Sequence, residues 1–186
     1  MWLCREAVRL FMWSHRDLTS FAATMTTATP RTPFTRDDIA IATRAADSFT
    51  RLYYNTYDSS TRVADLPSFY RTSSSLSWNG TTKQGLDGLK ELITKMPPTK
   101  HDMQSFDCHP IPGTSPPSLL ITVSGNVVHG RGPAGNPHTT GARTIDGHGR
   151  VFSQTFLLVP DATAAATKAG EVGKYYISAD ALRFVG

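Results

Sequence analysis

The sequence predicts an α+β fold in which three helices pack on the concave face of one bent antiparallel sheet. Two observations predict it. The first half of the chain holds three segments of helical periodicity and a short hairpin signal, and the second half holds four long segments with the alternation of strands. Such a sheet has one face covered by its own helices and one face left over.

Length and composition limit the class of protein. The 186 residues give one domain with a core, and a hydrophobic content of 39% with 18% charged residues is typical of a globular protein. The net charge of +4 comes from scattered basic residues, so charge alone does not predict a nucleic-acid groove. Cys4 and Cys108 lie far apart in the sequence, which indicates a reducing compartment. No apolar run is long enough for a membrane span, so no membrane partner is expected.

Residues 1–33 are expected to be a disordered leader or an upstream extension, and residues 34–186 to be the domain. The first 24 residues mix apolar and basic side chains, as a mitochondrial presequence does. Met25, however, opens the string MTTATPRTP, which is typical of a short leader. We therefore favour translation from Met25, with the preceding residues as an upstream extension.

The first helix is predicted from Thr35 to about Tyr57. Thr35 suits the N-cap position, and Asp38 stands where a capping box requires an acid. An apolar stripe then recurs every three or four residues at Ile39, Ala42, Ala46, Phe49 and Tyr53. A short helical piece at 61–70, broken by Pro67, is expected to add three side chains to the same core: Val63, Leu66 and Phe69.

A tight hairpin and a third helix follow. Leu76 and Trp78 lead into the turn pair Asn79-Gly80, whose residues both tolerate a positive φ, and residues 81–84 form the return strand. The third helix ends at the Pro97-Pro98 pair, and its apolar face consists of Leu86, Leu89, Leu92, Ile93 and Met96.

Four long strands complete the prediction. They are expected at about residues 101–111, 119–129, 151–160 and 174–185. The segment 130–149 is rich in glycine and proline without apolar periodicity, which predicts a mobile loop. A smaller alanine-rich loop is expected at 161–173.

The last strand carries the functional prediction. Alternation places one set of side chains on one face, namely Tyr175, Ile177, Ala179, Ala181, Arg183 and Val185. This face is mostly small and apolar and carries a single arginine, a composition expected where a second protein covers the sheet. An ordinary half-buried strand with a solvated arginine is the alternative interpretation.

Several local strings carry a family resemblance. They are FTRLYYNTYD on the first helix, LSWNG before the hairpin, Gly85 at the start of the third helix, FSQTFLL in the penultimate strand and ISADALRF at the end. These strings occur in order across residues 36–186. Together they resemble the nuclear transport factor 2-like fold and, within it, the nuclear transport factor 2-related export proteins, the small subunits of the TAP-type mRNA export receptor.

The resemblance implies a non-enzymatic subunit without a cofactor. Such a subunit pairs through its sheet face with a second domain of the same fold in the large subunit of the receptor, and nucleoporins and mRNA are contacted indirectly through the complex. The expected localisation is the nucleus and the nuclear pore, with shuttling to the cytoplasm. Arg183 matches the family's arginine that pairs with an acid of the large subunit, and strand alternation adds Gln154, Phe156 and Ile177 to the predicted interface.

Nuclear transport factor 2 itself, a homodimer that imports Ran-GDP, is one alternative. It resembles this chain in fold but reads Ran with acids after the tryptophan of its hairpin strand and in a later loop. Here the hairpin position is Asn79, and the loop at 130–149 holds Asp146 against Arg131 and Arg143. Ran binding is therefore not expected.

An enzyme is the alternative from a different class. The fold also resembles ketosteroid isomerase and scytalone dehydratase, which work in the cone between helices and sheet with side chains of shifted pKa. The candidates here are Tyr53, Tyr54, Asp107, His109 and Asp180. A filled cone would argue against this function, and an open pocket with converging Asp and Tyr would favour it. Structural roles are preferred, with Tyr53 in the core.

No metal site is expected. His129, His138 and His148 lie in or beside the loop at 130–149 without carboxylate or thiol neighbours. His101, His109 and Asp107 alternate along one strand, which we interpret as a polar sheet surface.

Overall fold

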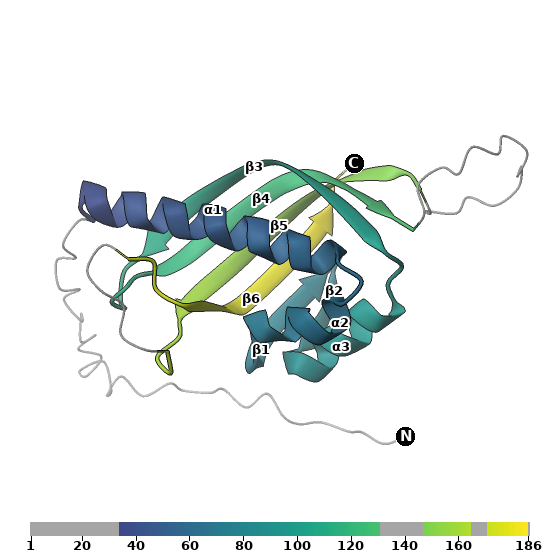
Figure 1. The fold of residues 1–186 in the computed structure, drawn as a ribbon, viewed down its shortest axis with the longest axis horizontal. Helices are drawn as coiled ribbons and strands as arrows, with labels where there is room; N and C mark the ends of the chain where they lie inside the picture. The colour runs from purple at the N-terminus through teal and green to yellow at the C-terminus, as the bar shows by residue number, and fades with distance from the viewer. Residues whose placement is uncertain (1–33, 131–146, 165–170, 186) are drawn as a thin grey trace, which may run out of the picture. The chain divides into compact units, whose positions relative to one another are not determined.

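The computed structural model describes residues 34–130, 147–164 and 171–185. The predictions for the leader at 1–33, for most of the loop at 130–149 and for the middle of the alanine-rich loop lie outside these residues. The described chain has the predicted α+β architecture, with helices on one face of a curved six-stranded sheet (Figure 1). No helix among the described residues is long and apolar enough to cross a membrane.

Helix α1 (Arg36–Asp58) begins where the sequence predicts. The amide of Asp38 donates to Thr35 Oγ1 at 3.1 Å, and Asp38 Oδ2 accepts from the amide of Thr35 at 2.9 Å, which completes the capping box. Its buried face consists of Ala42, Ala45, Ala46, Thr50, Tyr53, Tyr54 and Tyr57. Ile39, predicted in the apolar stripe, is 49% exposed, so contact with the sheet begins one turn later.

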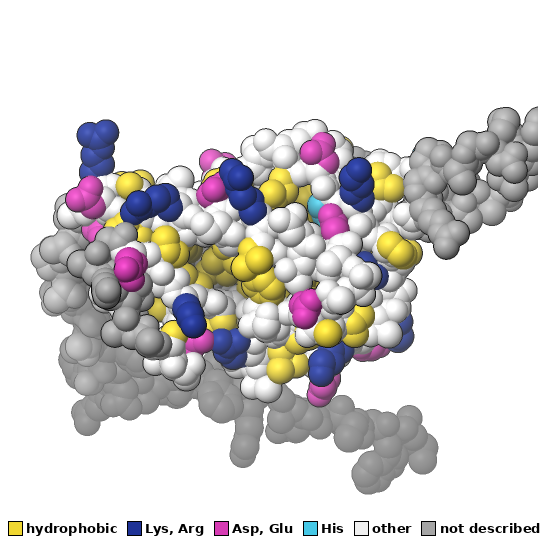
Figure 2. Space-filling model, in the orientation of Figure 1, with side chains coloured by type: hydrophobic (Ala, Val, Ile, Leu, Met, Phe, Trp, Pro, Cys, Tyr) yellow, Lys and Arg dark blue, Asp and Glu magenta, His cyan; other side chains and the backbone are white. Residues whose placement is uncertain are grey.

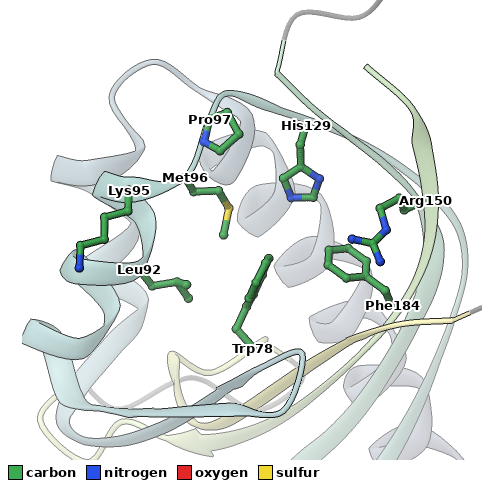
Figure 3. A pocket seen from close by; sticks show the side chains of 8 residues that line it. All are labelled: Trp78, Leu92, Lys95, Met96, Pro97, His129, Arg150 and Phe184. Carbon is green, nitrogen blue, oxygen red and sulfur yellow. The ribbon is translucent and has the colours of Figure 1, made fainter. Parts of the chain in front are cut away.

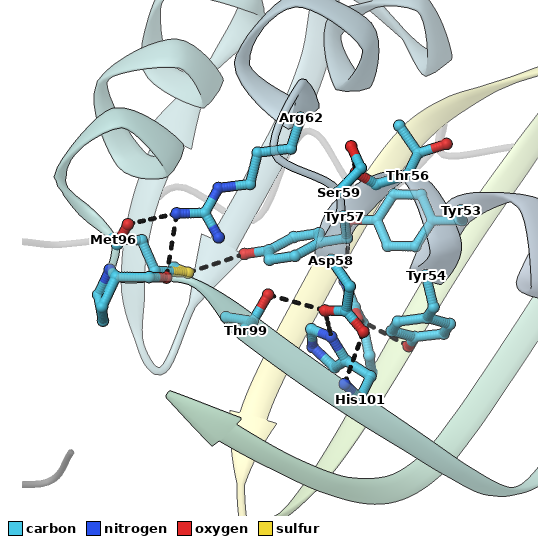
Figure 4. A network of polar contacts seen from close by, with 12 residues as sticks. Tyr53, Tyr54, Thr56, Tyr57, Asp58, Ser59, Arg62, Met96, Thr99 and His101 are labelled. Carbon is cyan, nitrogen blue, oxygen red and sulfur yellow. Dashed lines mark hydrogen bonds and ion pairs between the residues drawn. The ribbon is translucent and has the colours of Figure 1, made fainter. Parts of the chain in front are cut away.

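The next segment corrects one prediction. Residues 62–69 form helix α2 (Arg62–Asp65) and a 3₁₀ turn, η1 (Leu66–Phe69). Val63 was expected in the core but is 42% exposed, whereas Arg62 is buried. The Arg62 guanidinium donates to the carbonyls of Ile93, Met96 and Pro97 at the end of helix α3 (Gly85–Lys95), whose unpaired carbonyls favour a cation (Figure 4).

The sheet has the strand order β2-β1-β6-β5-β4-β3. Its strands are β1 (Tyr70–Trp78), β2 (Thr81–Gln84), β3 (Thr99–Ile111), β4 (Ser118–His129), β5 (Gly149–Pro160) and β6 (Tyr175–Phe184). Neighbours are antiparallel except β1 and β6, which run parallel, so the hairpin joins the four long strands through the last one. Asn79 and Gly80 both have positive φ in the β1–β2 turn, as the sequence predicts.

Two β-bulges reverse the alternation of side chains along the long strands. The register shifts between Met103 and Ser105 in β3, and Ser178 is the extra residue in β6 between Ile177 and Ala179. Gly125 of β4 lies opposite the first bulge, where an added Cβ would collide with the carbonyl of Asp102. Two side chains on opposite sides of a bulge therefore point to the same face of the sheet only if their residue numbers differ by an odd number.

The core lies between the helices and the concave face of the sheet. Tyr53, Tyr70, Phe152 and Phe156 are its largest fully buried side chains. Phe156 packs edge-on against Phe49 and Tyr53, with ring centroids 5.1 and 4.8 Å away. This packing closes the inner face and leaves the opposite face of the sheet without a described helix over it.

Candidate functional site

The uncovered side of the sheet, which we call the outer face, is built of short side chains in register across five strands. One row runs Ser77, Ala181, Thr155, Thr122 and Asp107, and the next runs Ser75, Ala179, Leu157, Leu120 and His109. One pair of hydroxyl groups within these rows bonds across strands, Thr122 Oγ1 to Thr155 Oγ1 at 3.4 Å. The result is a surface of backbone and mostly small groups, with two leucines at its centre.

A groove crosses this outer face. Its volume is about 380 Å³, and it passes over β2, β1 and β6 towards β4. Ala179, Ala181, Ser75 and Ser77 form its shallow floor, and Leu120 and Leu157 form an apolar side. Small residues beside large ones leave a depression that a protruding side chain of another protein can fill.

Arg183 stands in a third row of the outer face. Its neighbours across the strands are Ser153, Ser124 and Ser105. The side chain is exposed and makes no hydrogen bond or ion pair with any residue that the structure describes. A charged group is thus presented to the outside from an otherwise neutral row.

The other three residues predicted at the interface lie on the inner face, and this corrects the prediction. Gln154 is 2% exposed, and Phe156 and Ile177 are 0% exposed. Gln154 and Phe156 alternate with the outer residues of β5, and the bulge at Ser178 turns Ile177 to the same side as Asp180 and Leu182. These three side chains cannot touch a partner that covers the outer face. The sequence analysis did not name the outer residues of β4 and β5, such as Leu120 and Leu157, as interface residues. Strand alternation was the only feature of the sequence that could have placed them on the outer face.

A buried polar network occupies the cone. Asp180 accepts from Gln154 Nε2 at 2.7 Å and from the Tyr70 hydroxyl at 2.8 Å. The Tyr54 hydroxyl donates to Gln154 Oε1 at 2.8 Å, and the hydroxyls of Tyr53 and Tyr70 are 2.8 Å apart. Three of the candidate catalytic residues, Tyr53, Tyr54 and Asp180, therefore do converge. They are joined by Gln154, which the sequence placed at the interface instead, and by Tyr70, which the sequence did not single out.

The electrostatics of this network follow from burial. Burial raises the pKa of Asp180 to about 6, although the hydrogen bonds from Gln154 and the tyrosines act to lower it. Burial, together with the nearby Asp180 charge, also raises the pKa of Tyr53, Tyr54 and Tyr70 well above the ordinary value. The tyrosines are thus held as neutral donors.

The network leaves almost no free space. The cavity between Tyr53, Tyr57, Tyr70, Gln154 and Asp180 measures about 10 Å³. That is room for one water molecule at most. The Asp180 carboxyl has a raised pKa and hydrogen-bond donors around it, but a substrate could reach it only if the core opened.

The remaining enzymatic candidates do not join this cluster. Asp107 and His109 are exposed on the outer face, whereas the bulge in β3 turns His101 inward. His101 Nδ1 lies 2.6 Å from Asp58 Oδ1, and its amide donates to Asp58 Oδ2 at 2.7 Å (Figure 4). The expectation that His101, Asp107 and His109 share one surface is therefore wrong.

Asp58 fastens the end of α1 to β3. Thr99 Oγ1 also donates to its carboxylate, at 2.8 Å. Burial acts to raise the pKa of Asp58, but the hydrogen bonds from His101 and Thr99 outweigh it and hold that pKa below the ordinary value. This contact is structural, and the described residues contain no cluster of three or more side chains suited to a metal ion.

The charge on the helix side of the molecule is dispersed. Figure 2 shows lysine and arginine side chains standing apart, with acidic side chains between several of them. Exposed ion pairs neutralise part of the charge of the molecule, such as Arg51 with Asp47 at 3.0 Å. A continuous basic track for a phosphate backbone is not visible on this face.

Comparisons with known proteins assign the family. A model described as the nuclear transport factor 2 (NTF2) domain matches residues 45–134. NTF2-related export protein 2 from Homo sapiens is 31% identical over 147 residues, which cover 77% of this chain and 87% of that relative.

Solved structures agree on the fold. A chain from the complex of Mex67 and Mtr2 with a Sac3N peptide has a TM-score of 0.56 at 20% identity, covering 78% of this chain and 99% of that one. A scytalone dehydratase-like protein from Novosphingobium aromaticivorans has a TM-score of 0.54 at 13% identity, covering 82% and 89%. These two likenesses show a shared fold and do not choose between a binding protein and an enzyme. The identity to the human relative over most of both chains does decide the family: this chain belongs to the NTF2-related export proteins.

Proposed function

We propose that this protein is the non-enzymatic small subunit of a heterodimeric mRNA export receptor. The outer face of its sheet pairs with a second domain of the same fold in the large subunit. The heterodimer carries mRNA through nuclear pores, so that nucleoporins and RNA are met through the complex. The protein then resides in the nucleus and at the pore and shuttles to the cytoplasm, and the pairing domain is residues 34–186.

One observation carries this proposal. The outer face has three rows of small or hydroxyl-bearing side chains in register, with Leu120 and Leu157 at their centre and no described helix above them. An uncovered sheet face with exposed apolar groups is a surface on which a similar sheet can pack, since sheets stack about 10 Å apart with interdigitating side chains. The groove of about 380 Å³ would receive a projecting side chain of the partner.

Arg183 supplies the specific contact. Its guanidinium is exposed in a row of serines and has no acidic partner among the described residues. Once a partner covers the face, this cation needs an acid of that partner, because a buried charge without a partner is costly. Removing one member of such a pair costs on the order of 2–5 kcal/mol of binding free energy.

The alternatives have less support. An enzyme needs space for a substrate beside Asp180, and the cavity there is about 10 Å³. A Ran-importing homodimer needs an acidic surface near the hairpin tryptophan, whereas Asn79 accepts at 3.4 Å from the amide of Phe184 and serves the turn. The residues Asp146, Arg131 and Arg143 of the later loop lie outside the described chain.

Co-purification tests the proposal. The tagged chain, expressed in cells of its own organism, is expected to bring down a larger protein that contains a second domain of this fold, identified by its peptides. Arg183→Glu is expected to abolish this capture while far-UV circular dichroism is retained. Lys90→Glu, an exposed charge reversal on α3, and deletion of residues 1–24 should both leave capture intact.

Two outcomes would contradict the proposal. Capture of the larger protein by Arg183→Glu at the wild-type level would remove the assigned role of this arginine. Recovery of the tagged chain only with itself, as a homodimer, would replace the heterodimer by the other known arrangement of this fold.

A further inference from the structure

Strand β6 pairs least regularly with its neighbours at the point where it enters the outer-face groove. Residues 71–74 of β1 lie opposite Ser178 alone, which interrupts the β1–β6 ladder. On the other side of β6, Ser178 is also the extra residue relative to β5. Both ladders are therefore irregular directly before Ala179, which belongs to the floor of the groove.

Side-chain hydrogen bonds tie β6 to both neighbours just beyond this interruption. Asp180 accepts from the Tyr70 hydroxyl of β1 at 2.8 Å and from Gln154 Nε2 of β5 at 2.7 Å. One carboxylate thus joins three adjacent strands, and we call these three side chains the Asp180 bridge. Tyr70 precedes the insertion at 71–74, whereas Asp180 lies opposite Leu76 after it, so the bond between Tyr70 and Asp180 spans the interrupted ladder.

The Asp180 bridge lies directly behind the groove. The cavity of about 10 Å³ on the inner side and the groove of about 380 Å³ on the outer side share three lining residues, namely Leu76, Ser77 and Asp180. One sheet thickness therefore separates the bridge from the groove floor. The position of β6 between β1 and β5 determines both the geometry of the bridge and the width of that floor.

The bridge has no such relation to another large hollow of the molecule. An apolar pocket of about 360 Å³ lies between the end of α3 and the ends of the long strands, with Met96, Arg150 and Phe184 in its walls (Figure 3). No member of the Asp180 bridge is among the described residues that line it. An effect of the bridge is thus expected at the groove and not at this pocket.

We propose that the Asp180 bridge positions the groove floor for the partner, so that Tyr70, Gln154 and Asp180 influence pairing without touching the partner. This inference rests on the proposed pairing through the outer face. The three side chains are buried, so their effect passes through the backbone of β1, β5 and β6. Without the bridge, β6 shifts at the interrupted ladder, and a floor of altered width fits the same partner side chain less well.

Two conservative substitutions separate positioning from general stability. Tyr70→Phe removes the hydrogen bond across the interruption and keeps the buried ring. Tyr57→Phe is the matched control, because its hydroxyl is also in the core but donates to Met96 Sδ at 3.1 Å and belongs to no strand contact. Both variants lose one hydrogen bond of a buried tyrosine, and only the first loses a tie between strands.

The isolated chain tests the first step of the proposal. Ser77 and Ala181 are paired across β1 and β6 and both line the groove. Tyr70→Phe is expected to shift the amide proton and nitrogen signals of this pair in a nuclear magnetic resonance spectrum, whereas Tyr57→Phe leaves them in place. The amide of Arg150, from the pocket in Figure 3, is the internal reference and should stay unchanged in both variants.

Dissociation of the complex tests the second step. The sample is the tagged chain bound to the large subunit recovered by co-purification. Tyr70→Phe is expected to raise the dissociation rate at least about threefold, and Tyr57→Phe to leave it at the wild-type value. Asp180→Asn is a second variant at the bridge. Its amide has one acceptor oxygen and cannot accept from both Tyr70 and Gln154, so it should act in the same direction as Tyr70→Phe.

Two results would overturn the proposal. Unchanged amide signals of Ser77 and Ala181 in Tyr70→Phe would mean that the bridge does not set the groove floor. Equal dissociation rates for Tyr70→Phe and Tyr57→Phe would mean that the bridge serves stability alone. A wild-type chain that captures no larger protein would instead contradict the pairing proposal, and the amide signals of the isolated chain still decide whether the bridge shapes the groove.

Discussion

The two faces of strands β5 and β6 differ in burial, in side-chain size and in how their polar groups are paired. Inward, Phe152, Gln154 and Phe156 are fully covered, and each polar atom of the Gln154–Asp180 contact has a defined partner. Outward, Ser153, Thr155 and Ala181 are small and partly or fully accessible, and their two rows have no covering element among the described residues. The comparison shows that the inner face of the sheet is buried and stabilises the fold, whereas the outer face is left accessible among the described residues.

A substitution pair on adjacent residues of β5 tests this contrast with the largest expected effect. Phe156→Ala removes a ring packed against Phe49, Tyr53 and Tyr54, and should lower the free energy of unfolding by about 3–5 kcal/mol. Thr155→Ala, one residue away on the outer face, should change it by less than about 0.5 kcal/mol. Urea denaturation measures both, and similar losses would mean that the outer face is as tightly packed as the inner one.

The buried carboxyl gives the inner face a pH dependence. The raised pKa of Asp180, about 6 against an ordinary 3.8, means that the folded chain keeps this proton between pH 4 and 6 after the unfolded chain has lost it. The contribution of Asp180 to the free energy of unfolding therefore decreases as pH rises through this window, by on the order of 3 kcal/mol in total.

Asp180→Asn isolates that effect. The free energy of unfolding of the wild type minus that of the variant is measured by urea denaturation at each pH. This difference should decrease by on the order of 3 kcal/mol between pH 4 and pH 7. Other titrating groups, such as Asp58, are present in both chains and cancel in the difference. If the difference in unfolding free energy does not vary with pH, the pKa of Asp180 is not raised by burial in this network.

Removing one donor from the network should have a smaller effect. Tyr54→Phe leaves the buried Gln154 Oε1 without its 2.8 Å hydrogen bond, which should cost about 1–3 kcal/mol in unfolding free energy. Tyr176→Phe is the matched control, since its half-buried ring packs under the Arg71 guanidinium and its hydroxyl has no described bond. Equal free energies of unfolding for the two variants would mean that the hydrogen bond from Tyr54 to Gln154 does not stabilise the fold.

The outer-face arginine should have the smallest effect on the isolated chain. Arg183→Glu alters an exposed side chain without a described ion pair, so unfolding free energy should change by less than about 0.5 kcal/mol. A loss above about 1 kcal/mol in thermal or urea unfolding would mean that Arg183 serves its own domain instead of a partner.

Local features of the fold were predictable because their causes are local. The capping box of Thr35 and Asp38 fixes the start of α1, and the Asn79-Gly80 turn fixes the hairpin, each within four residues of sequence. The exposure of Val63 and the burial of Arg62 were not predictable in this way. They depend on where the carbonyl end of α3 lies, which is a matter of tertiary packing.

The assignment of faces shows the same limit at the candidate site. Alternation divides Gln154 and Thr155 between two faces, but it does not say which face is inside. Gln154 is inside because Tyr54 and Asp180, distant in sequence, satisfy its amide. The bulges at Gln104 and Ser178 then reverse the alternation, which is why His101 and Ile177 were placed on the wrong side.

Protection of the outer face by a partner is the most direct test of the central claim. A single cysteine is introduced by Ala181→Cys in a chain with Cys4→Ser, where Cys108 reacts slowly because burial raises its pKa to about 11. Lys90→Cys in the same background reports on the helix side. Maleimide labelling rates are then compared for the isolated chain and for its complex with the large subunit. The account predicts that labelling at position 181 slows by at least about tenfold in the complex while labelling at position 90 is unchanged, and equal rates at position 181 in both samples would contradict it.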